Sequence, residues 1–464
     1  MEIFTRKWSE ISGGRFDADY NNIYLPNSTK TYPLKNLCVI KGGKRIPKGK
    51  TYATYPTIYK YLRVDDLNSN EMQIDINSLK SIDKEIFEAL KRYEIHNDEI
   101  ALSNAGTIGK TLLFHNDTKN KVVLTENCVK LQVTKNILPK FLTIVLKTNF
   151  VQQQLKQNYI QTTIPKLAIE RIKDLKIPEI PPKEIQEQII DIMDNAYLLK
   201  NKKENEAKEL LNSVDSYLLA ELGIELPSKD ISLEHRIYTT KLSHISGKRF
   251  DCEYHQSYYK ALEEAIQKGK YQTEKIQDSV FVNQQLEYME KYNFINYIDL
   301  SCIDKENGII KDTILINLNF PSRARQKVHK GDLLVSTLSG SMKAIALIEE
   351  DKENLIASTG FFVINKVKNI SKDFLISILR TDLFQILLKR KASGSIMSSI
   401  NYNDFLNLKI PLPPLSVQEK IADEITKRKH KALNLQKEAK ECLNSAKIQV
   451  EKIILRQQQK DERM

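Results

Sequence analysis

Two sets of polar segments carry the side chains of this 464-residue chain that are best suited to recognising another molecule. Lys and Arg can bind phosphates or guanine edges, and Ser, Thr and Asn can read other base edges in a DNA groove. Glycines within these segments let backbone N–H groups come close to a phosphate. The candidate DNA-binding residues of the first half are Lys44, Arg45, Lys48, Lys50, Ser103, Asn104, Thr107, Lys110, Thr125, Asn127, Thr162 and Lys166. Those of the second half are Arg323, Arg325, Ser336, Thr337, Ser339, Ser341, Lys343, Ser358, Lys391, Ser393 and Ser395.

For any one of these residues, an ordinary solvated turn is the simpler interpretation. The sets gain weight because their segments, such as 103–110 and 336–343, occupy matching places in two halves of the chain. The net charge of +12 favours a polyanionic partner, since each neutralised phosphate releases counterions. Taken alone, the charge fits a merely basic, soluble protein equally well.

The sequence lacks the motifs of the common catalytic sites. Residues 106–110 have the wrong spacing for a nucleotide-binding P-loop, and no dinucleotide fingerprint, zinc-protease motif, methyltransferase motif or nuclease core occurs. The seven histidines have no paired ligand spacing. We therefore expect a chain that catalyses nothing by itself and binds no metal or cofactor.

Cysteine usage and hydropathy indicate where the protein works. The five cysteines are scattered without a Cys-x-x-Cys pair, which favours reduced thiols over disulfides or a zinc site. No apolar run is long enough to cross a bilayer, and the first residues lack the apolar core of a signal peptide. These features predict a cytoplasmic protein.

The dominant feature of the chain is a duplication. The proline-rich segment 176–189 returns as 409–421, and each copy leads into an apolar-periodic, charged segment. Matching positions outside this segment lie 233 or 234 residues apart, a period far above that of solenoid repeats. The chain therefore contains one module used twice. Further matches pair 11–20 with 245–254, 61–67 with 294–300, and 141–148 with 374–381.

Each copy of the proline-rich segment precedes a long amphipathic helix. The first is predicted over 183–222, with Gly223 ending it, and the second begins with a capping box, Ser416 to Glu419. At 1.5 Å per residue each helix extends roughly 60 Å, too far to cover its apolar stripe with one ordinary domain. Near-heptad spacing predicts that the helices pair with each other, antiparallel, with a globular domain near each end. Separate packing of each helix on its own domain is the alternative.

Short β-rich runs alternate with helical ones in both globular parts. We predict an α+β fold with two homologous mixed α/β domains, two long helices pairing as an antiparallel coiled coil, and a pseudo-twofold internal repeat. The predicted parts are domain 1 (1–181), a central long helix (182–226), domain 2 (227–414) and a distal long helix (415–464).

This arrangement resembles the specificity (S) subunit of type I restriction-modification systems. Residues 177–189 and 410–421 carry the resemblance, supported by 331–336 and by the Arg-Phe-Asp segments at 15–20 and 249–254. The proline motif of the first half is one residue longer, and the second half lacks the Gly-Gly-Lys loop. Those departures concern loop contacts.

The resemblance implies a non-catalytic subunit with two target recognition domains, each reading one half of a bipartite double-stranded DNA site in phage defence. It implies that the helices dock two adenine methyltransferase subunits and that restriction subunits join them. S-adenosylmethionine, ATP and Mg²⁺ would bind those partners. The candidate docking residues at the helix starts are Gln186, Glu187, Gln418 and Glu419.

Two other interpretations stay open. A coiled-coil scaffold with protein-binding ends would bind DNA weakly and without sequence preference. An RNA-binding protein is disfavoured, because no aromatic RNA-binding sheet motif is visible.

Overall fold

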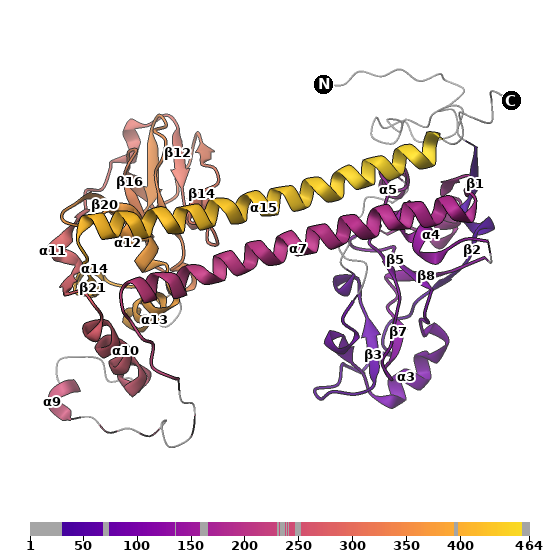
Figure 1. Ribbon diagram of the computed structural model, residues 1–464, viewed down its shortest axis with the longest axis horizontal. Helices are drawn as coiled ribbons and strands as arrows, with labels where there is room; N and C mark the ends of the chain where they lie inside the picture. The colour runs from indigo at the N-terminus through magenta and orange to yellow at the C-terminus, as the bar shows by residue number, and fades with distance from the viewer. Residues whose placement is uncertain are drawn as a thin grey trace. The chain divides into compact units, whose positions relative to one another are not determined.

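The computed structural model describes residues 30–67, 74–134, 136–157, 166–229, 232, 237, 239, 241–245, 252–393 and 398–456 (Figure 1). The chain divides into two compact units, 1–204 with 437–464, and 205–436. We call the globular parts of these units domain 1 and domain 2. The matching segment 11–20 and part of its counterpart 245–254 lie outside the described residues.

Domain 1 contains two small sheets and a strand pair. An antiparallel sheet has the order β2-β8-β5-β6, and a second sheet has the order β4-β3-β7, with β3 and β7 parallel. β1 pairs with β9, which joins the start of the domain to its end. The strands are β1 (Thr31–Pro33), β2 (Cys38–Gly42), β3 (Tyr59–Leu62), β4 (Lys80–Ser81), β5 (Ile100–Ser103), β6 (Thr111–Leu113), β7 (Lys121–Leu124), β8 (Cys128–Val133) and β9 (Lys176–Pro178). The helices are α3 (Lys84–Leu90), α4 (Pro139–Leu146), α5 (Asn149–Gln157) and α6 (Ile169–Lys173).

Domain 2 repeats this topology, with a fourth strand in its second sheet and an additional antiparallel pair, β13-β14. Its antiparallel sheet has the order β11-β20-β17-β18, its second sheet the order β15-β12-β19-β16 with β12 and β19 parallel, and β10 pairs with β21. The strands are β10 (Thr273–Lys275), β11 (Val280–Asn283), β12 (Ile295–Ile298), β13 (Ile303–Asp304), β14 (Ile309–Ile310), β15 (Ile314–Ile316), β16 (Ala324–Lys327), β17 (Leu333–Ser336), β18 (Ile345–Leu347), β19 (Leu355–Ser358), β20 (Phe361–Val367) and β21 (Lys409–Pro411). The helices are α9 (Leu242–Ile245), α10 (Ser257–Lys268), α11 (Ile276–Ser279), α12 (Lys372–Leu379), α13 (Asp382–Lys391) and α14 (Tyr402–Leu406). The predicted duplication of a mixed α/β domain is confirmed.

One sequence match was wrong by three residues. Tyr61 pairs with Val123 across the parallel strands, and the equivalent pairing in domain 2 joins Tyr297 to Ile356. Tyr61 therefore corresponds to Tyr297, not to Phe294. Short strands with similar apolar composition do not fix their own register, because only the neighbouring strand selects it.

The two long helices are α7 (Lys183–Glu221) and α15 (Leu415–Arg456). In the first unit, Ile189 and Met193 of α7 share a core with Val450 of α15, and Lys203 lies 2.5 Å from Glu438. The start of α7 thus packs against the end of α15.

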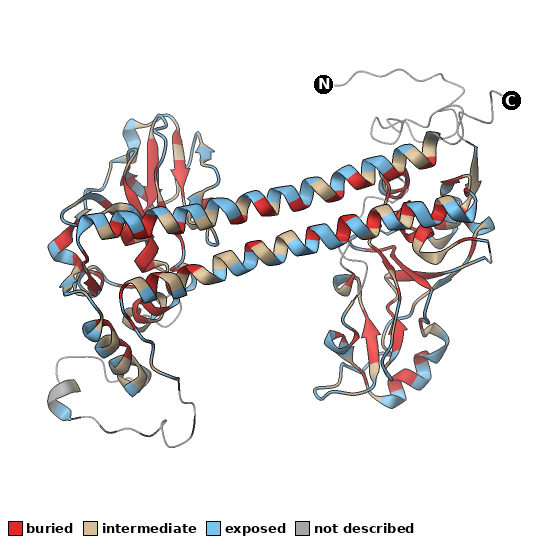
Figure 2. Cartoon of the chain, viewed as in Figure 1, coloured by how far each residue is buried: buried red, intermediate tan, exposed pale blue. Residues whose placement is uncertain are grey.

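In the second unit, Leu218 near the end of α7 shares a core with Ile421 near the start of α15, and Ala207 packs on Ala432. Both units therefore show antiparallel pairing, and separate packing of the helices is excluded. Figure 2 shows the buried positions on the central strands and in stripes along the helices.

The ends of the long helices differ partly from prediction. Gly223 has a φ of 64°, the left-handed conformation expected of a helix-ending glycine. The second helix begins at Leu415, so Ser416 lies inside it and the predicted capping box is not the helix start. Instead, the backbone N–H groups of Val417 and Gln418 donate to the carbonyl of Pro414.

Candidate nucleic-acid interface

In domain 1 the predicted polar segments meet in space. We call residues 43–50, 103–110, 125–127 and 166 loop cluster 1. The backbone N–H of Lys44 donates to Leu124 O at 2.9 Å, and that of Asn104 donates to Asn127 O at 2.9 Å. Ala105 forms an isolated β-bridge with Lys166. The cluster lies where β2 and β5 end and β8 begins, because antiparallel neighbours place those ends together.

Gly43 permits this close approach. A Cβ atom at this position would lie 2.0 Å from the carbonyl oxygen of Thr125 and 2.5 Å from that of Leu124. Any side chain would push the 43–50 segment away from the 125–127 turn. The second half lacks this glycine pair, so its corresponding loop starts differently.

The buried polar members of loop cluster 1 shape the loops. The Ser103 hydroxyl donates to Thr107 O at 2.5 Å and accepts from Lys110 N at 2.9 Å. The Asn104 side chain donates to Leu167 O at 3.2 Å, while its Oδ1 has no hydrogen-bond partner among the described residues. Ser103, Asn104 and Thr125 are at most 7% exposed. Their predicted contact with DNA therefore requires the loops to open, and in this structure they hold the loops instead.

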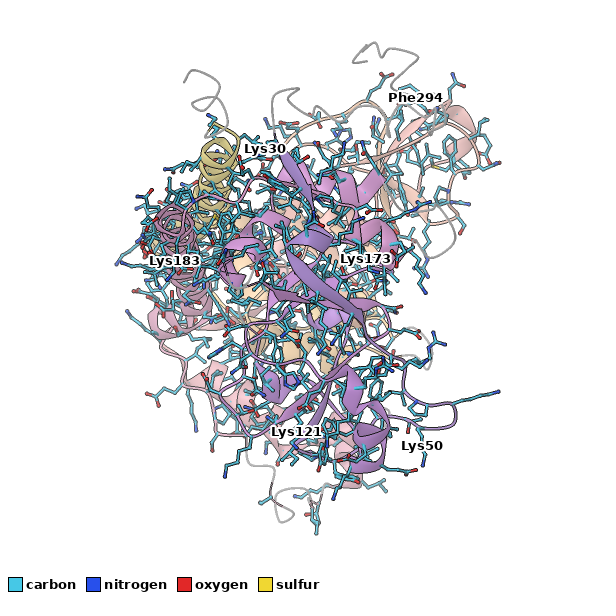
Figure 3. The ribbon with its side chains drawn as sticks, turned by 90° about the vertical axis from the view of Figure 1, so that its right-hand side faces the viewer. Lys30, Lys50, Lys121, Lys173, Lys183 and Phe294 are labelled. Carbon is cyan, nitrogen blue, oxygen red and sulfur yellow. The ribbon has the colours of Figure 1, made fainter. Side chains whose placement is uncertain are left out.

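The exposed members of loop cluster 1 are mostly cations. Arg45 forms an ion pair with Glu126 at 2.5 Å, and Lys50 forms one with Glu85 of α3 at 2.8 Å. Figure 3 shows Lys50 and Lys121 on the part of domain 1 that carries α3. The half-buried Lys110 donates to Val64 O at 3.2 Å. The exposed candidates are Lys44, Arg45, Lys48, Lys50, Thr107 and Lys166; Asn127 is half-buried, and Thr162 lies outside the described residues.

Domain 2 brings together the corresponding segments. We call residues 323–325, 336–343, 358–359, 391–393 and 398–399 loop cluster 2. Thr359 N donates to Arg323 O at 2.8 Å, and Ser339 N donates to Ser398 O at 2.9 Å. Lys343 lies 2.8 Å from Asp382, the first residue of α13.

Burial sorts the members of loop cluster 2 as it does in domain 1. The hydroxyl of Ser336 accepts from Leu338 N at 3.2 Å, and that of Ser358 accepts from Gly360 N at 3.1 Å. The exposed candidates are Arg323, Arg325, Lys343 and Ser393; the half-buried ones are Thr337, Ser339, Ser341 and Lys391; Ser395 lies outside the described residues. Both domains therefore present cations around buried hydroxyl groups.

Sequence reasoning missed several exposed apolar side chains beside these cations. Glu287 N donates to Arg325 O at 2.7 Å, and the flanking Leu286 and Tyr288 are 56% and 79% exposed. Tyr52 and Tyr55 are also exposed, beyond the Lys44–Lys50 segment. Nothing in the sequence distinguishes these residues, because an exposed apolar residue in a loop looks the same there as a buried one.

The docking candidates differ from one another in burial. Gln186 accepts from Leu138 N at 2.9 Å and donates to Pro181 O at 2.9 Å and Asn136 O at 3.3 Å. Gln418 repeats all three bonds with Ser371 N, Pro413 O and Asn369 O, at 2.8, 2.8 and 3.0 Å. Each side chain is at most 1% exposed, so neither glutamine can touch a partner directly. Glu187 and Glu419 are exposed.

The remaining chemistry of the described residues is limited. None of their His, Cys, Asp and Glu side chains form a group of three or more that could hold a metal ion. Burial raises the pKa of the Cys38 and Cys128 thiols to about 12, which makes them poor nucleophiles. No helix in the described part of the chain is long and apolar enough to span a bilayer.

Comparisons with known proteins agree with this architecture. The specificity subunit of the MjaVIII type I restriction enzyme from Methanocaldococcus jannaschii is 25% identical over 377 residues, 77% of this chain and 78% of that protein. The putative MjaX specificity subunit of the same organism is 23% identical over 449 residues, 93% of each chain. The match with the HindI specificity subunit of Haemophilus influenzae, at 27% identity, spans only 32% of each chain.

A solved structure concerned with complex assembly and conformational transition of a type I R-M system covers 94% of this chain and 98% of its own. The TM-score is 0.54 at 14% identity, so this likeness is one of fold. The family described as the type I restriction modification DNA specificity domain matches twice, over residues 26–212 and 263–444. Because these two matches cover most of the chain and coincide with its two repeated modules, the chain belongs to the family of type I restriction-modification DNA specificity subunits.

Proposed function

We propose that the chain is the sequence-reading subunit of a type I restriction-modification complex and that each domain reads one half of a bipartite double-stranded DNA site. The observation that carries this proposal is the recurrence of one loop cluster in each domain, at equivalent strand ends, with exposed Lys or Arg side chains in both. Phosphate contacts by these cations would position each domain, and the neighbouring polar groups would select bases.

The long helices have two roles in this proposal. They act as a spacer between the two readers, and their starts dock two methyltransferase subunits. Glu187 and Glu419 are the docking side chains we favour, because both are exposed in the first turns of their helices. The buried Gln186 and Gln418 would support docking indirectly, because their hydrogen bonds fix the direction in which each helix leaves its domain. S-adenosylmethionine, ATP and Mg²⁺ belong to the partners, and we expect the complex to work in the cytoplasm.

Methylation mapping tests the main claim. The chain is combined with the methyltransferase subunit of its own system, and methylated adenines are located in a DNA library. A single bipartite motif is expected. Replacing residues 1–181 with those of another such subunit should change one half-site only. A change in both half-sites would refute modular reading, and methylation without a motif would favour a protein-binding scaffold.

The spacer claim needs a change in both helices, because they pair. Inserting one heptad near Glu204 in α7 and one near Gln436 in α15 keeps their apolar faces in register. Seven residues add roughly 10 Å, or about three base pairs. We expect the two half-sites to keep their sequences and to move apart by about that amount. Unchanged spacing with altered half-sites would show that the helices are no ruler.

A further inference from the structure

A seven-residue motif occurs once in each half and has no role in the function proposed above. It is Leu146-Lys147-Thr148-Asn149-Phe150-Val151-Gln152 in the first half and Leu379-Arg380-Thr381-Asp382-Leu383-Phe384-Gln385 in the second. The two copies share their first, third and last residues. In the structure they form the turns between α4 and α5 and between α12 and α13.

The shared residues make the same bonds in both domains. The Thr148 hydroxyl donates to Val145 O at 2.6 Å, and Gln152 N donates to Thr148 O at 2.9 Å. Thr381 repeats the first bond with Ile378 O at 2.8 Å, and Gln385 N repeats the second with Thr381 O at 2.9 Å. These hydrogen bonds within the turn therefore fix the position of the glutamine backbone, from which its side chain extends.

Each glutamine side chain then connects this turn by hydrogen bonds to one loop of loop cluster 1 or loop cluster 2. Gln152 Nε2 donates to Leu146 O at 2.7 Å and to Gly109 O at 2.9 Å, in the loop between β5 and β6. Gln385 Nε2 donates to Leu379 O at 2.7 Å and to Met342 O at 3.3 Å, in the loop between β17 and β18. In each domain one side-chain amide thus joins a carbonyl group of the turn to a carbonyl group of the loop.

The contacts between the loop and the turn differ between the two domains. Gly109 has a φ of 92°, and a Cβ atom there would lie 2.5 Å from Gln152 Oε1, so only glycine fits beneath the amide. In domain 2 the hydrogen bond from the Gln385 amide to the loop is longer, at 3.3 Å against 2.9 Å for that from Gln152. There Lys343 adds an ion pair with Asp382 at 2.8 Å, and Arg380 donates to Lys343 O at 2.6 Å.

The turn is also held by the long helix of the other half. Phe150 N in α5 donates to Glu451 of α15 at 2.8 Å, and Asp382 N in α13 donates to Asp215 of α7 at 2.7 Å. A carboxylate at the start of a helix stabilises its unpaired N–H groups. Each loop is thereby connected, through one glutamine, to the helix pair.

We propose that Gln152 and Gln385 are positioning residues that hold the β5–β6 and β17–β18 loops in the conformation that reads DNA, each for the half-site of its own domain. This inference rests on the proposed function. Neither glutamine needs to touch DNA, because each acts through the carbonyl group that it holds. Losing these hydrogen bonds would let the loop adopt other conformations, and bases would be discriminated less well.

The test uses the full chain with its methyltransferase subunit. Methylation rates are compared on the cognate duplex and on duplexes with one altered base pair in either half-site. Gln152→Ala is expected to lower discrimination roughly three- to tenfold, the effect of losing one or two ordinary hydrogen bonds. The loss should be confined to the half-site assigned to domain 1 by domain exchange. Gln385→Ala should do the same for the other half-site only.

Matched variants separate positioning from folding. Gln153→Ala changes the exposed neighbour in α5 and should leave discrimination at both half-sites intact. Gln152→Glu cannot donate to either carbonyl and should lower discrimination at least as much as the alanine variant. Should Gln152→Ala fail to assemble, Gln385→Ala, with its longer loop bond, carries the test.

Two results would overturn the inference. One is unchanged discrimination in an assembled Gln152→Ala or Gln385→Ala complex, and the other is an equal loss at both half-sites from a single substitution. A wild-type complex without any site preference would instead refute the proposed function, and this inference with it.

Discussion

The two junctions between a domain and the helix pair use opposite charges at equivalent places. In the second unit, Asp215 of α7 accepts from Asp382 N and lies near Arg380. In the first unit, the residue equivalent to Asp215 is Lys447 of α15, which lies near Lys147. The capping acid of the first unit is Glu451, one turn further along α15. Both halves thus have an acidic residue that caps the helix start, but this residue occupies a different position on the long helix in each half.

This difference has a measurable electrostatic consequence. Burial, with a contribution from Lys447, lowers the pKa of Lys147 to about 8. In the second unit, burial and Arg380 lower the pKa of Lys429 to about 8, but Asp215 and Asp373 act in the opposite direction. The first junction therefore places Lys147 and Lys447 close enough for each to oppose the charge of the other, whereas in the second junction Asp215 and Asp373 favour the charged form of Lys429. The fold shared by the two domains accommodates either arrangement of charges when the helix start remains capped.

The largest effect is expected where the two junctions agree. Gln186→Ala and Gln418→Ala each leave a buried N–H and two carbonyl groups without a partner. Each should lower the free energy of unfolding of its own unit by about 2–4 kcal/mol. Denaturant unfolding followed by domain-specific probes measures this loss. The exposed Gln188→Ala should cost almost nothing; a similar cost for Gln188 and Gln186 would contradict the assignment.

The like-charge junction gives a pH-dependent prediction. Lys147→Met should stabilise the first unit at pH 7 by up to about 3 kcal/mol, because each pKa unit of depression corresponds to about 1.4 kcal/mol. Below pH 8 both folded and unfolded chains carry the proton, so the gain is complete. Between pH 8 and the ordinary lysine value the native state loses its proton first, so wild-type stability rises and the gain shrinks. Unfolding at pH 7 and pH 10 measures it, and a pH-independent gain would contradict the buried charge.

The two capping acids provide a smaller contrast. Asp215→Ala removes both a helix cap and the counter-charge of Arg380, so it should cost about 2 kcal/mol. Glu451→Ala removes only the cap, and about 1 kcal/mol is expected. Thermal melting of the two variants ranks them. Equal losses would indicate that the counter-charge has no net value.

The smallest effect concerns single cations of the loop clusters. The exposed Lys48 has no ion-pair partner within the described residues, whereas Lys343 is paired with Asp382. If both touch phosphates, Lys48→Ala should lower the slope of log K against log salt by about one, and Lys343→Ala by less. Binding of the assembled complex to DNA between low and moderate salt measures the slopes. A larger change for Lys343 would reverse the ranking.

Much of the fold was predictable because it depends on patterns that span many residues. The helix over 183–222 was predicted within one residue of α7, since apolar residues repeated along its whole length. The match between β3 and its counterpart in domain 2 was not predicted correctly, because four residues contain too little pattern to align a strand. The loop clusters were predicted as sets, yet Ser103 and Thr125 proved to be buried.

The sequence by itself determined the duplication, the long helices and the family, because each leaves a signal over long stretches of chain. Tertiary structure alone decided which polar side chains face solvent and which are used inside. Gln186, Gln418, Gln152 and Gln385 look like surface residues in the sequence. Each glutamine forms its structural hydrogen bonds only when a carbonyl group from another segment comes within hydrogen-bonding distance. That proximity arises from the packing of strands and helices.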